Sequence, residues 1–172
     1  HGGFRVDPSL SLEFPTENVP DYQQCLDTFV DSIRTIAERV DAYDVELSVE
    51  NNVVTEENAP DGESLLLFAE PQDFHQFYQK LASEDIGILL DTGHLKVSAR
   101  TLGFELEQFV EELAEHIDVL HLHTNDGETD QHKPPTSQEM ELIDELDSVT
   151  PTLEAHFKTK TQLRNYIESV SK

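Results

Sequence analysis

Four short runs of the chain carry the residue pattern of β-strands. Residues 45–50 alternate apolar and polar side chains, and residues 118–123 do so with a mostly apolar face. Residues 86–91 are nearly all apolar, and residues 152–156 form a shorter fourth run. Because successive side chains of a strand point to opposite faces, each run predicts a strand with one face for covering helices.

Longer segments around these runs carry apolar residues every three or four positions, which predicts amphipathic helices. The stripes lie in residues 22–40, 71–81, 106–117, 140–146 and 163–170. Pro71 stands at a favoured first helical position, and Thr136 with Glu139 matches a capping box. Thr159 with Gln162 repeats that pattern before the last stripe. Strands that alternate with helices predict βαβ units and a parallel sheet.

A side chain able to bind metal stands at the C-terminal end of each predicted strand. These four residues are Glu50, Asp91, His123 and Glu154, each about one strand–helix unit from the next. A flat doubly wound sheet favours apolar residues on both faces, whereas β/α barrels collect their active sites at the C-terminal ends of the strands. The pattern therefore predicts an α/β fold of the (β/α)8 TIM-barrel type.

The length of the chain bears on how much of that barrel it holds. A TIM barrel takes about 250 residues, whereas this chain has 172 and begins at His1 rather than Met. We therefore expect an N-terminally incomplete barrel with about five C-terminal βα units. Residues 1–172 would form a single domain, the C-terminal two-thirds of the barrel.

The composition narrows the classes of protein to consider. The 36 acidic residues outnumber the 11 basic ones, for a net charge of −25. A negative surface repels phosphate backbones, which weighs against nucleic acid unless high salt screens the repulsion. The single cysteine excludes a disulfide scaffold. With neither a membrane-length apolar run nor a recognisable leader, the expectation is an acidic cytoplasmic protein.

The four strand-end residues also indicate a cofactor. Any one of them alone is an ordinary polar residue at a strand–loop junction. Three carboxylates and an imidazole that converge on one barrel mouth would, however, repel one another without a cation. Such a mixed oxygen and nitrogen set suits Mn²⁺ or Zn²⁺, with Co²⁺, Fe²⁺ and Mg²⁺ as alternatives.

Several stretches around these residues resemble the xylose-isomerase-like barrel superfamily, which includes sugar isomerases and epimerases and the endonuclease IV type of DNA-repair enzyme. The stretches are residues 48–52, 89–94, 122–127, 130–132 and 153–154. The Asp-Thr-Gly-His run at residues 91–94 is the most specific of them. The resemblance extends from the first residues to the last predicted helix.

The resemblance implies roles by position. Glu50, Asp91, His123 and Glu154 match the four metal ligands of the sugar branch. His94 matches a histidine that contacts substrate in the sugar enzymes and binds a second metal in the nucleases. Further ligands of the nuclease's three-metal cluster are matched by His1, Asp130 and His132.

Two more histidines are candidates for metal or substrate contact. His121 shares a strand face with His123 but lies deeper, which favours a supporting or barrel-filling role over direct contact. His156 lies beyond the last strand on the same side as Glu154, where it could touch a substrate.

The function implied is a divalent-metal-dependent isomerase or epimerase of a sugar or sugar phosphate. The metal would polarise a carbonyl and stabilise an enediolate. Glu50 and Glu154 would transfer the proton, and His94 would bind a substrate oxygen. We expect a small-molecule partner and no membrane partner, and leave open whether the chain forms a homo-oligomer.

Two alternatives remain at this point. The first is an endonuclease IV-like, metal-dependent phosphodiesterase that acts at abasic DNA sites. The net charge of −25 weighs against it, and residues 133–137 lack the glycine-containing loop usual in the nucleases. The second is an inactive barrel fragment that binds a metal or a partner, since an open barrel leaves unpaired strand edges.

Overall fold

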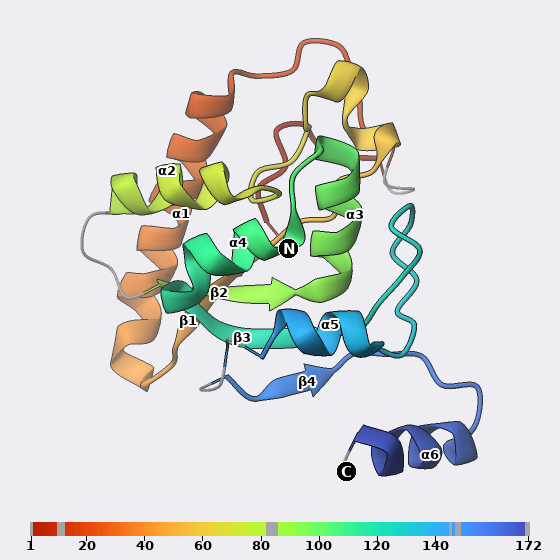
Figure 1. Ribbon diagram of the computed structural model, residues 1–172. Helices are drawn as coiled ribbons and strands as arrows, with labels where there is room; N and C mark the ends of the chain where they lie inside the picture. Colours follow the sequence, from red (N-terminus) through yellow and green to blue (C-terminus); the bar gives the residue numbers. More distant parts are fainter. Residues whose placement is uncertain (1, 10–12, 82–85, 145, 147–148, 171–172) are drawn as a thin grey trace.

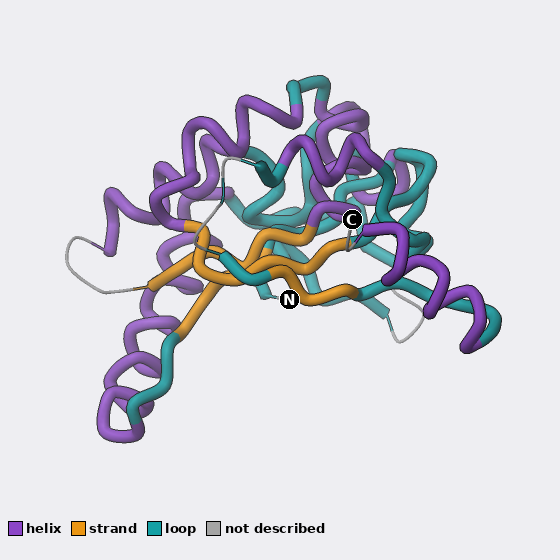
Figure 2. The backbone as a smooth tube through the Cα atoms, turned by 60° about the horizontal axis from the view of Figure 1, so that its bottom comes forward, coloured by secondary structure: helices purple, strands orange, loops and turns teal. Residues whose placement is uncertain are grey.

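The computed structural model describes residues 2–9, 13–81, 86–144, 146 and 149–170. Its centre is a parallel sheet in which the four strands follow one another in chain order. The strands are β1 (Leu47–Glu50), β2 (Ile86–Asp91), β3 (Ile117–Leu122) and β4 (Pro151–Leu153). Figure 2 shows most of the helical turns on one side of these strands.

Within the described residues, six α-helices connect or flank the strands (Figure 1). They are α1 (Tyr22–Val40), α2 (Pro71–Leu81), α3 (Thr92–Leu102), α4 (Leu106–Leu113), α5 (Ser137–Leu142) and α6 (Lys160–Val170). Short 3-10 turns cover Asp41–Tyr43, Glu56–Asn58, Pro60–Gly62 and Ala114–His116. Among the described helices, none combines the length and the apolar character needed to cross a bilayer.

The two faces of the sheet differ as the alternation of the strands predicts. Ile86, Ile88 and Leu90 of β2 are buried in the hydrophobic core with side chains of α1, α2 and α4. The opposite face of β2 carries Leu89 and ends at Asp91. The carboxyl ends of parallel strands lie side by side along one edge of the sheet. The face that carries Leu89 therefore presents polar ligand groups at that edge.

The core is centred on a group of phenylalanine rings. Phe68 lies 5.2 Å from the ring centroids of both Phe74 and Phe77. Phe74 in turn meets Phe109 of α4 edge-on at 5.6 Å. Tilted and edge-to-face pairs of this kind are favourable beyond their buried area. These ring contacts pack α2 against α4 and against the segment that precedes α2.

Most predicted elements are confirmed, with small shifts at their ends. Helices α1 and α2 span the predicted residues, and the capping box at Thr136 is formed. The apolar stripe of residues 106–117 divides into α4, a 3-10 turn and the first residue of β3. Strand β3 ends at Leu122 and β4 at Leu153, so two predicted ligands lie one residue beyond their strands.

Helix α3 is not among the helices that the apolar stripes predict. It begins at Thr92, directly after β2, without an intervening loop. Its buried residues include the polar Thr92, His94 and Ser98, so no apolar stripe marks its buried face. The Asp91 carboxylate starts the helix by accepting a 2.8 Å hydrogen bond from the His94 amide.

Candidate metal centre

Side chains able to bind metal gather at the carboxyl ends of β1, β2 and β3. Three overlapping groups each place their ligand atoms within 4.8 Å of one another. The groups are Asp91, His94 and His123; His123, Asp130 and His132; and Glu50, Asp91 and His121. Because Asp91 and His123 each belong to two groups, the seven residues form one continuous cluster, which we call the ligand cluster.

Asp91 and His123 form the buried centre of the ligand cluster. Nε2 of His123 lies 2.8 Å and 3.0 Å from the two carboxylate oxygens of Asp91, and both side chains are at most 1% exposed. Burial alone would raise the pKa of Asp91, but the bond from His123 and the charge of His94 outweigh it and lower that pKa. Burial likewise favours neutral His123, yet the Asp91 bond raises its pKa above the usual value.

His94 is oriented by two contacts with neighbouring elements. Its Nδ1 lies 2.9 Å from the backbone oxygen of Asn51. A carbonyl oxygen only accepts, so Nδ1 donates this bond, while Nε2 faces Asp130 Oδ2 at 3.4 Å. Burial would lower the pKa of His94, but the bond to Asp130 and the nearby Asp91 charge raise it to about 9.

The loop after β3 brings Asp130 and His132 into the ligand cluster. Hydrogen bonds of 2.9 Å and 2.8 Å between Thr124 and Lys133 close this loop. Nε2 of His132 lies 3.0 Å from Asp130 Oδ2, and the His132 ring stacks on His123 at 4.2 Å. One carboxylate, that of Asp130, therefore lies near three imidazoles.

Glu154 is not one of the seven residues of the ligand cluster, but it contacts one of them, His121. Its Oε2 lies 2.7 Å from Nδ1 of His121, and its side chain is 43% exposed. His121 pairs in register with Asp91 on the neighbouring strand. It is therefore level with Asp91, while it precedes His123, which directly follows the same strand, by two residues, as the strand pattern predicts.

The remaining predicted residues lie at the margin of the site or outside it. His156 is exposed, and its ring is 5.2 Å from that of His132. Its amide donates a 2.7 Å hydrogen bond to the His132 carbonyl oxygen. His156 therefore stabilises the loop that carries Asp130 and His132. His1 lies outside the described residues.

The donor chemistry of the ligand cluster fits a divalent cation. Donors that surround one ion with bonds of about 2.1 Å lie roughly 3 Å from each other. The Asp91 oxygens and His123 Nε2 already have that spacing. The mixture of carboxylate oxygen and imidazole nitrogen suits Mn²⁺, Zn²⁺, Co²⁺ or Fe²⁺.

A buried charge network lies behind the ligand cluster, and the sequence pattern does not predict it. The Glu139 carboxylate of α5 accepts hydrogen bonds from Lys96 at 2.8 Å, Thr124 at 2.5 Å and Thr136 at 2.6 Å. Burial alone would raise the Glu139 pKa, but these donors lower it to about 2. The network ties α3 and α5 to the residue that follows His123. Glu139 is visible in the sequence only as a helix-capping residue.

This network predicts a specific loss of stability in acid. The folded pKa of Glu139, about 2, lies below its ordinary value. Its stabilising contribution is therefore fully present above about pH 4.5 and is lost as the pH falls toward 2. We expect wild type to exceed Glu139→Gln in free energy of unfolding by on the order of 2 kcal/mol near pH 7.

Urea unfolding of both proteins near pH 7 and near pH 3 measures this difference, and the comparison cancels the titration of the other acids. The advantage of wild type should shrink at the lower pH. If the two proteins differed in free energy of unfolding by the same amount at both pH values, the lowered pKa of Glu139 would be contradicted.

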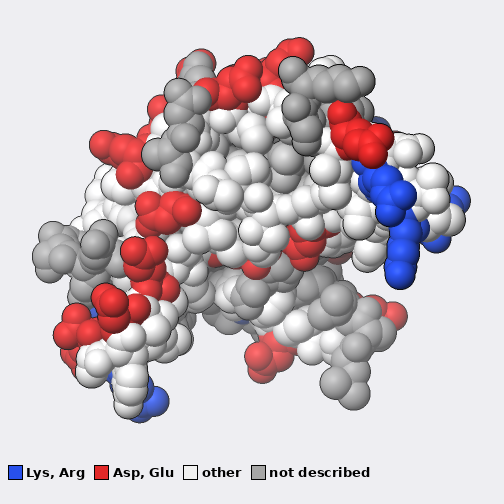
Figure 3. All heavy atoms as spheres, turned by 90° about the horizontal axis from the view of Figure 1, so that it is seen from below, with Lys and Arg blue, Asp and Glu red and all other residues white. Residues whose placement is uncertain are grey.

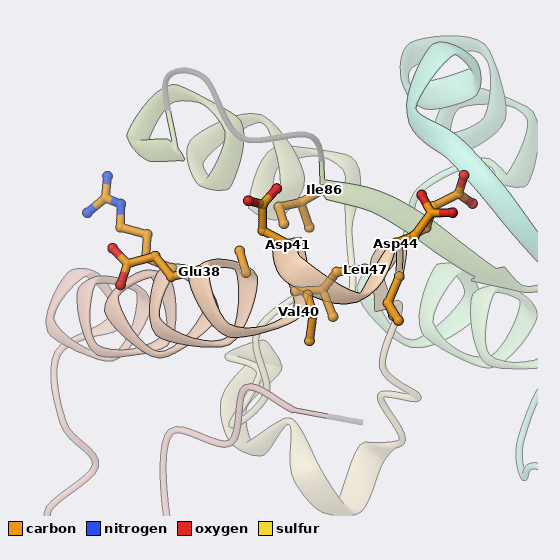
Figure 4. A pocket seen from close by; sticks show the side chains of 10 residues that line it. Glu38, Val40, Asp41, Asp44, Leu47 and Ile86 are labelled. Atoms are coloured by element: carbon orange, nitrogen blue, oxygen red, sulfur yellow. The ribbon is translucent and has the colours of Figure 1, made fainter.

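The molecule also has a pocket that is distinct from the ligand cluster. It has a volume of about 600 Å³ and lies beside the end of α1 and the first residues of β1 and β2 (Figure 4). Its walls combine apolar side chains such as Val40 and Leu47 with the carboxylates of Glu38, Asp41 and Asp44. None of its lining residues belongs to the ligand cluster, which lies at the opposite ends of the strands.

The surface charge bears on the kind of substrate. Acidic side chains are scattered over the face shown in Figure 3, and lysine and arginine appear mainly near its margins. A duplex phosphate backbone needs a continuous basic track. The described residues on this face do not form one.

Comparisons with known proteins identify the family of the chain. A family model described as a xylose isomerase-like TIM barrel matches residues 2–150. No curated protein matches the chain.

Two solved structures show the same architecture. A D-tagatose 3-epimerase-like protein shares 22% identity and a TM-score of 0.65, over 91% of this chain and 60% of its own. The apo form of 3-keto-D-glucoside 4-epimerase from E. coli shares 11% identity and a TM-score of 0.65, over 98% of this chain and 61% of its own. At these identities the likeness establishes the fold, and the chain spans about 60% of the length of either structure.

Proposed function

The chain belongs to the xylose isomerase-like TIM-barrel family, and on that premise we propose that it is a divalent-metal-dependent isomerase or epimerase of a sugar or sugar phosphate. The observation that carries the proposal is the ligand cluster at the carboxyl ends of the strands. Active sites of β/α barrels lie at that end. Of the two structural neighbours, one is a sugar epimerase and the other is described as similar to one, which supports the substrate class.

In this proposal Glu50, Asp91, His123 and Glu154 hold the cation, with Mn²⁺ or Zn²⁺ as the foremost candidates. His121 is an alternative ligand, because it groups with Glu50 and Asp91 and contacts Glu154. When bound, a divalent cation supplies Lewis acidity, which polarises a carbonyl oxygen and stabilises negative charge on the neighbouring oxygen.

The two glutamates are suited to the proton transfer by their places in the sheet. Glu50 ends β1, and Glu154 follows β4, so they flank the Asp91–His123 centre from the first and the last described strand. One carboxylate takes the proton from the carbon next to the carbonyl, and the other, or the same one, returns it. Its return to the neighbouring carbon gives an isomer, and its return to the opposite face of the same carbon gives an epimer.

His94 serves in this proposal as a substrate contact. Its Nδ1 is held by the carbonyl of Asn51, so Nε2 is the nitrogen that can reach a substrate oxygen. Asp130 lies beside that nitrogen and orients the ring. Asp130 and His132 remain candidates for a further cation or for substrate hydroxyl groups.

The test begins with metal binding. We expect isothermal titration calorimetry of the metal-free protein with MnCl₂ to show a bound ion, and Asp91→Asn to weaken that binding at least about 100-fold, since it removes a buried ligand charge. A panel of ketoses and their phosphates, followed by chromatography, should then show interconversion that EDTA stops and Mn²⁺ restores. A wild-type protein that binds neither Mn²⁺ nor Zn²⁺, or turnover that EDTA leaves unchanged, would overturn the proposal.

A second function is favoured by one observation. The group of His123, Asp130 and His132 lies directly beside that of Asp91, His94 and His123. Adjacent groups of this kind could hold two ions, as a metal-dependent phosphodiesterase requires. Cleavage of an abasic oligonucleotide together with a count of two or three bound ions would favour this function over the isomerase. Metal binding without either activity would point to a binding role.

A further inference from the structure

The residue that follows each of the first two proposed ligands is polar and almost completely buried. Asn51 follows Glu50 and is 0% exposed, and Thr92 follows Asp91 and is 1% exposed. Burying an amide or a hydroxyl costs free energy unless it is hydrogen-bonded. The partners of these two side chains therefore indicate what they do.

The carboxamide of Asn51 continues the β1–β2 pairing past the end of the strand. Regular pairing ends where Glu50 meets Leu89. Beyond that point Asn51 Oδ1 accepts a 2.6 Å bond from the Asp91 amide, and its Nδ2 donates a 3.1 Å bond to the Asp91 carbonyl. A carboxamide has the same donor and acceptor as a peptide group, so it takes the place of the next strand residue.

Thr92 repeats this arrangement one strand further on. Its Oγ1 donates a 2.6 Å hydrogen bond to the His123 carbonyl and accepts a 3.1 Å bond from the His123 amide. A hydroxyl is both donor and acceptor, so the two bonds form together. The backbone of His123, which lies one residue past β3, is thereby held against α3.

We infer that Asn51 and Thr92 are positioning residues, each of which fixes the backbone of the proposed ligand on the next strand. The inference rests on the proposed function for the roles of Glu50, Asp91 and His123. Short side chains such as that of Asp91 cannot compensate for a displaced backbone. We call the paired hydrogen bonds of Asn51 with Asp91 and of Thr92 with His123 the two clamps. They set the distance between the donor atoms of Asp91 and His123, and through it the affinity for the cation.

Matched variants separate this role from a general contribution to stability. Asn51→Ala and Thr92→Val remove the clamps, whereas Thr92→Ser keeps the hydroxyl. Asn52→Ala is the control for Asn51, because Asn52 is also buried and donates two 2.7 Å bonds to the carbonyls of Gly2 and Leu67, outside the ligand cluster.

Calorimetric titration with MnCl₂ gives the first readout. Asn51→Ala and Thr92→Val should each bind Mn²⁺ about 10- to 100-fold more weakly than wild type, the usual effect of losing a partner outside the ligand shell. Thr92→Ser and Asn52→Ala should stay within about threefold of wild type, even where Asn52→Ala lowers the Tm. Wild-type affinity in both clamp variants, or equal losses in Asn51→Ala and Asn52→Ala, would overturn the inference.

Amide hydrogen exchange on the metal-free proteins gives a second readout that does not depend on the cation. The Asp91 amide should exchange at least about 10-fold faster in Asn51→Ala, and the His123 amide in Thr92→Val, with neighbouring strand amides unchanged. Retained protection of both amides would overturn the inference. A wild-type protein that binds no metal would overturn only the proposed function. The exchange result would still show whether Asn51 and Thr92 fix the backbone of Asp91 and His123.

Discussion

Replacing Glu50 with glutamine should abolish sugar turnover while the protein remains folded. Glutamine has nearly the shape of glutamate but cannot take a proton, and general acid–base groups contribute roughly 10²- to 10⁴-fold to a rate. The Glu50 side chain is only 17% exposed, and its Oε1 lies 3.6 Å from Nδ1 of His94. We therefore expect a fall in kcat of at least about 100-fold at saturating Mn²⁺, with an unchanged circular dichroism spectrum.

Glu46→Gln is the matched control for this variant. Glu46 precedes the same strand by one residue, is exposed, and lines the pocket at the opposite end of the strand. It should keep the wild-type kcat. Full activity in Glu50→Gln would remove Glu50 from the proton-transfer step.

Replacing Gly93 with alanine should displace His123 and abolish metal binding. A Cβ at Gly93 would lie 1.9 Å from Cε1 and 2.3 Å from Nδ1 of the His123 ring. No real Cβ approaches so closely, and the ring is fully buried and stacked on His132 at 4.2 Å. We expect Mn²⁺ affinity to fall more than about 100-fold and stability to fall by about 1–3 kcal/mol, the usual cost of overpacking.

The control for Gly93→Ala should destabilise the protein without touching the ligand cluster. Gly62 has a φ of +80°, and a Cβ added there would meet no atom within 4 Å. Gly62→Ala should therefore lower the Tm through backbone strain of about 1 kcal/mol and leave Mn²⁺ affinity unchanged. Wild-type Mn²⁺ affinity in Gly93→Ala would contradict the position of the His123 ring.

Much of the fold could be predicted from local patterns. The stripe of residues 22–40 and the alternation of residues 45–50 each reflect burial of one face of one element, which depends on nearby positions alone. Helix α3 could not be predicted in this way, because Asp91 ends a strand and also caps a helix. The first residues of α3 adjoin the ligand cluster, and their types do not follow helix propensity.

Some residues of the candidate site could also be predicted from local patterns, and others could not. The positions of Glu50 and Asp91 at strand ends follow from alternation and from the parallel sheet. Asp130 and His132 lie in a loop without periodicity, and only the resemblance to the family points to them. The strand pattern predicts that His121 lies deeper than His123, but the level of His121 relative to Asp91 depends on strand register, which pairing between distant segments sets. The structure places His121 level with Asp91.

The sequence by itself determined the class of fold and the residue types that end its strands, since periodicity and strand-end chemistry are local properties of the chain. Only the tertiary structure decided which donors come within reach of one another. The contact of Asp130 with His94 joins segments 36 residues apart, and that of Asn51 with Asp91 joins segments 40 residues apart. Such contacts depend on strand register and loop closure, which no local pattern encodes.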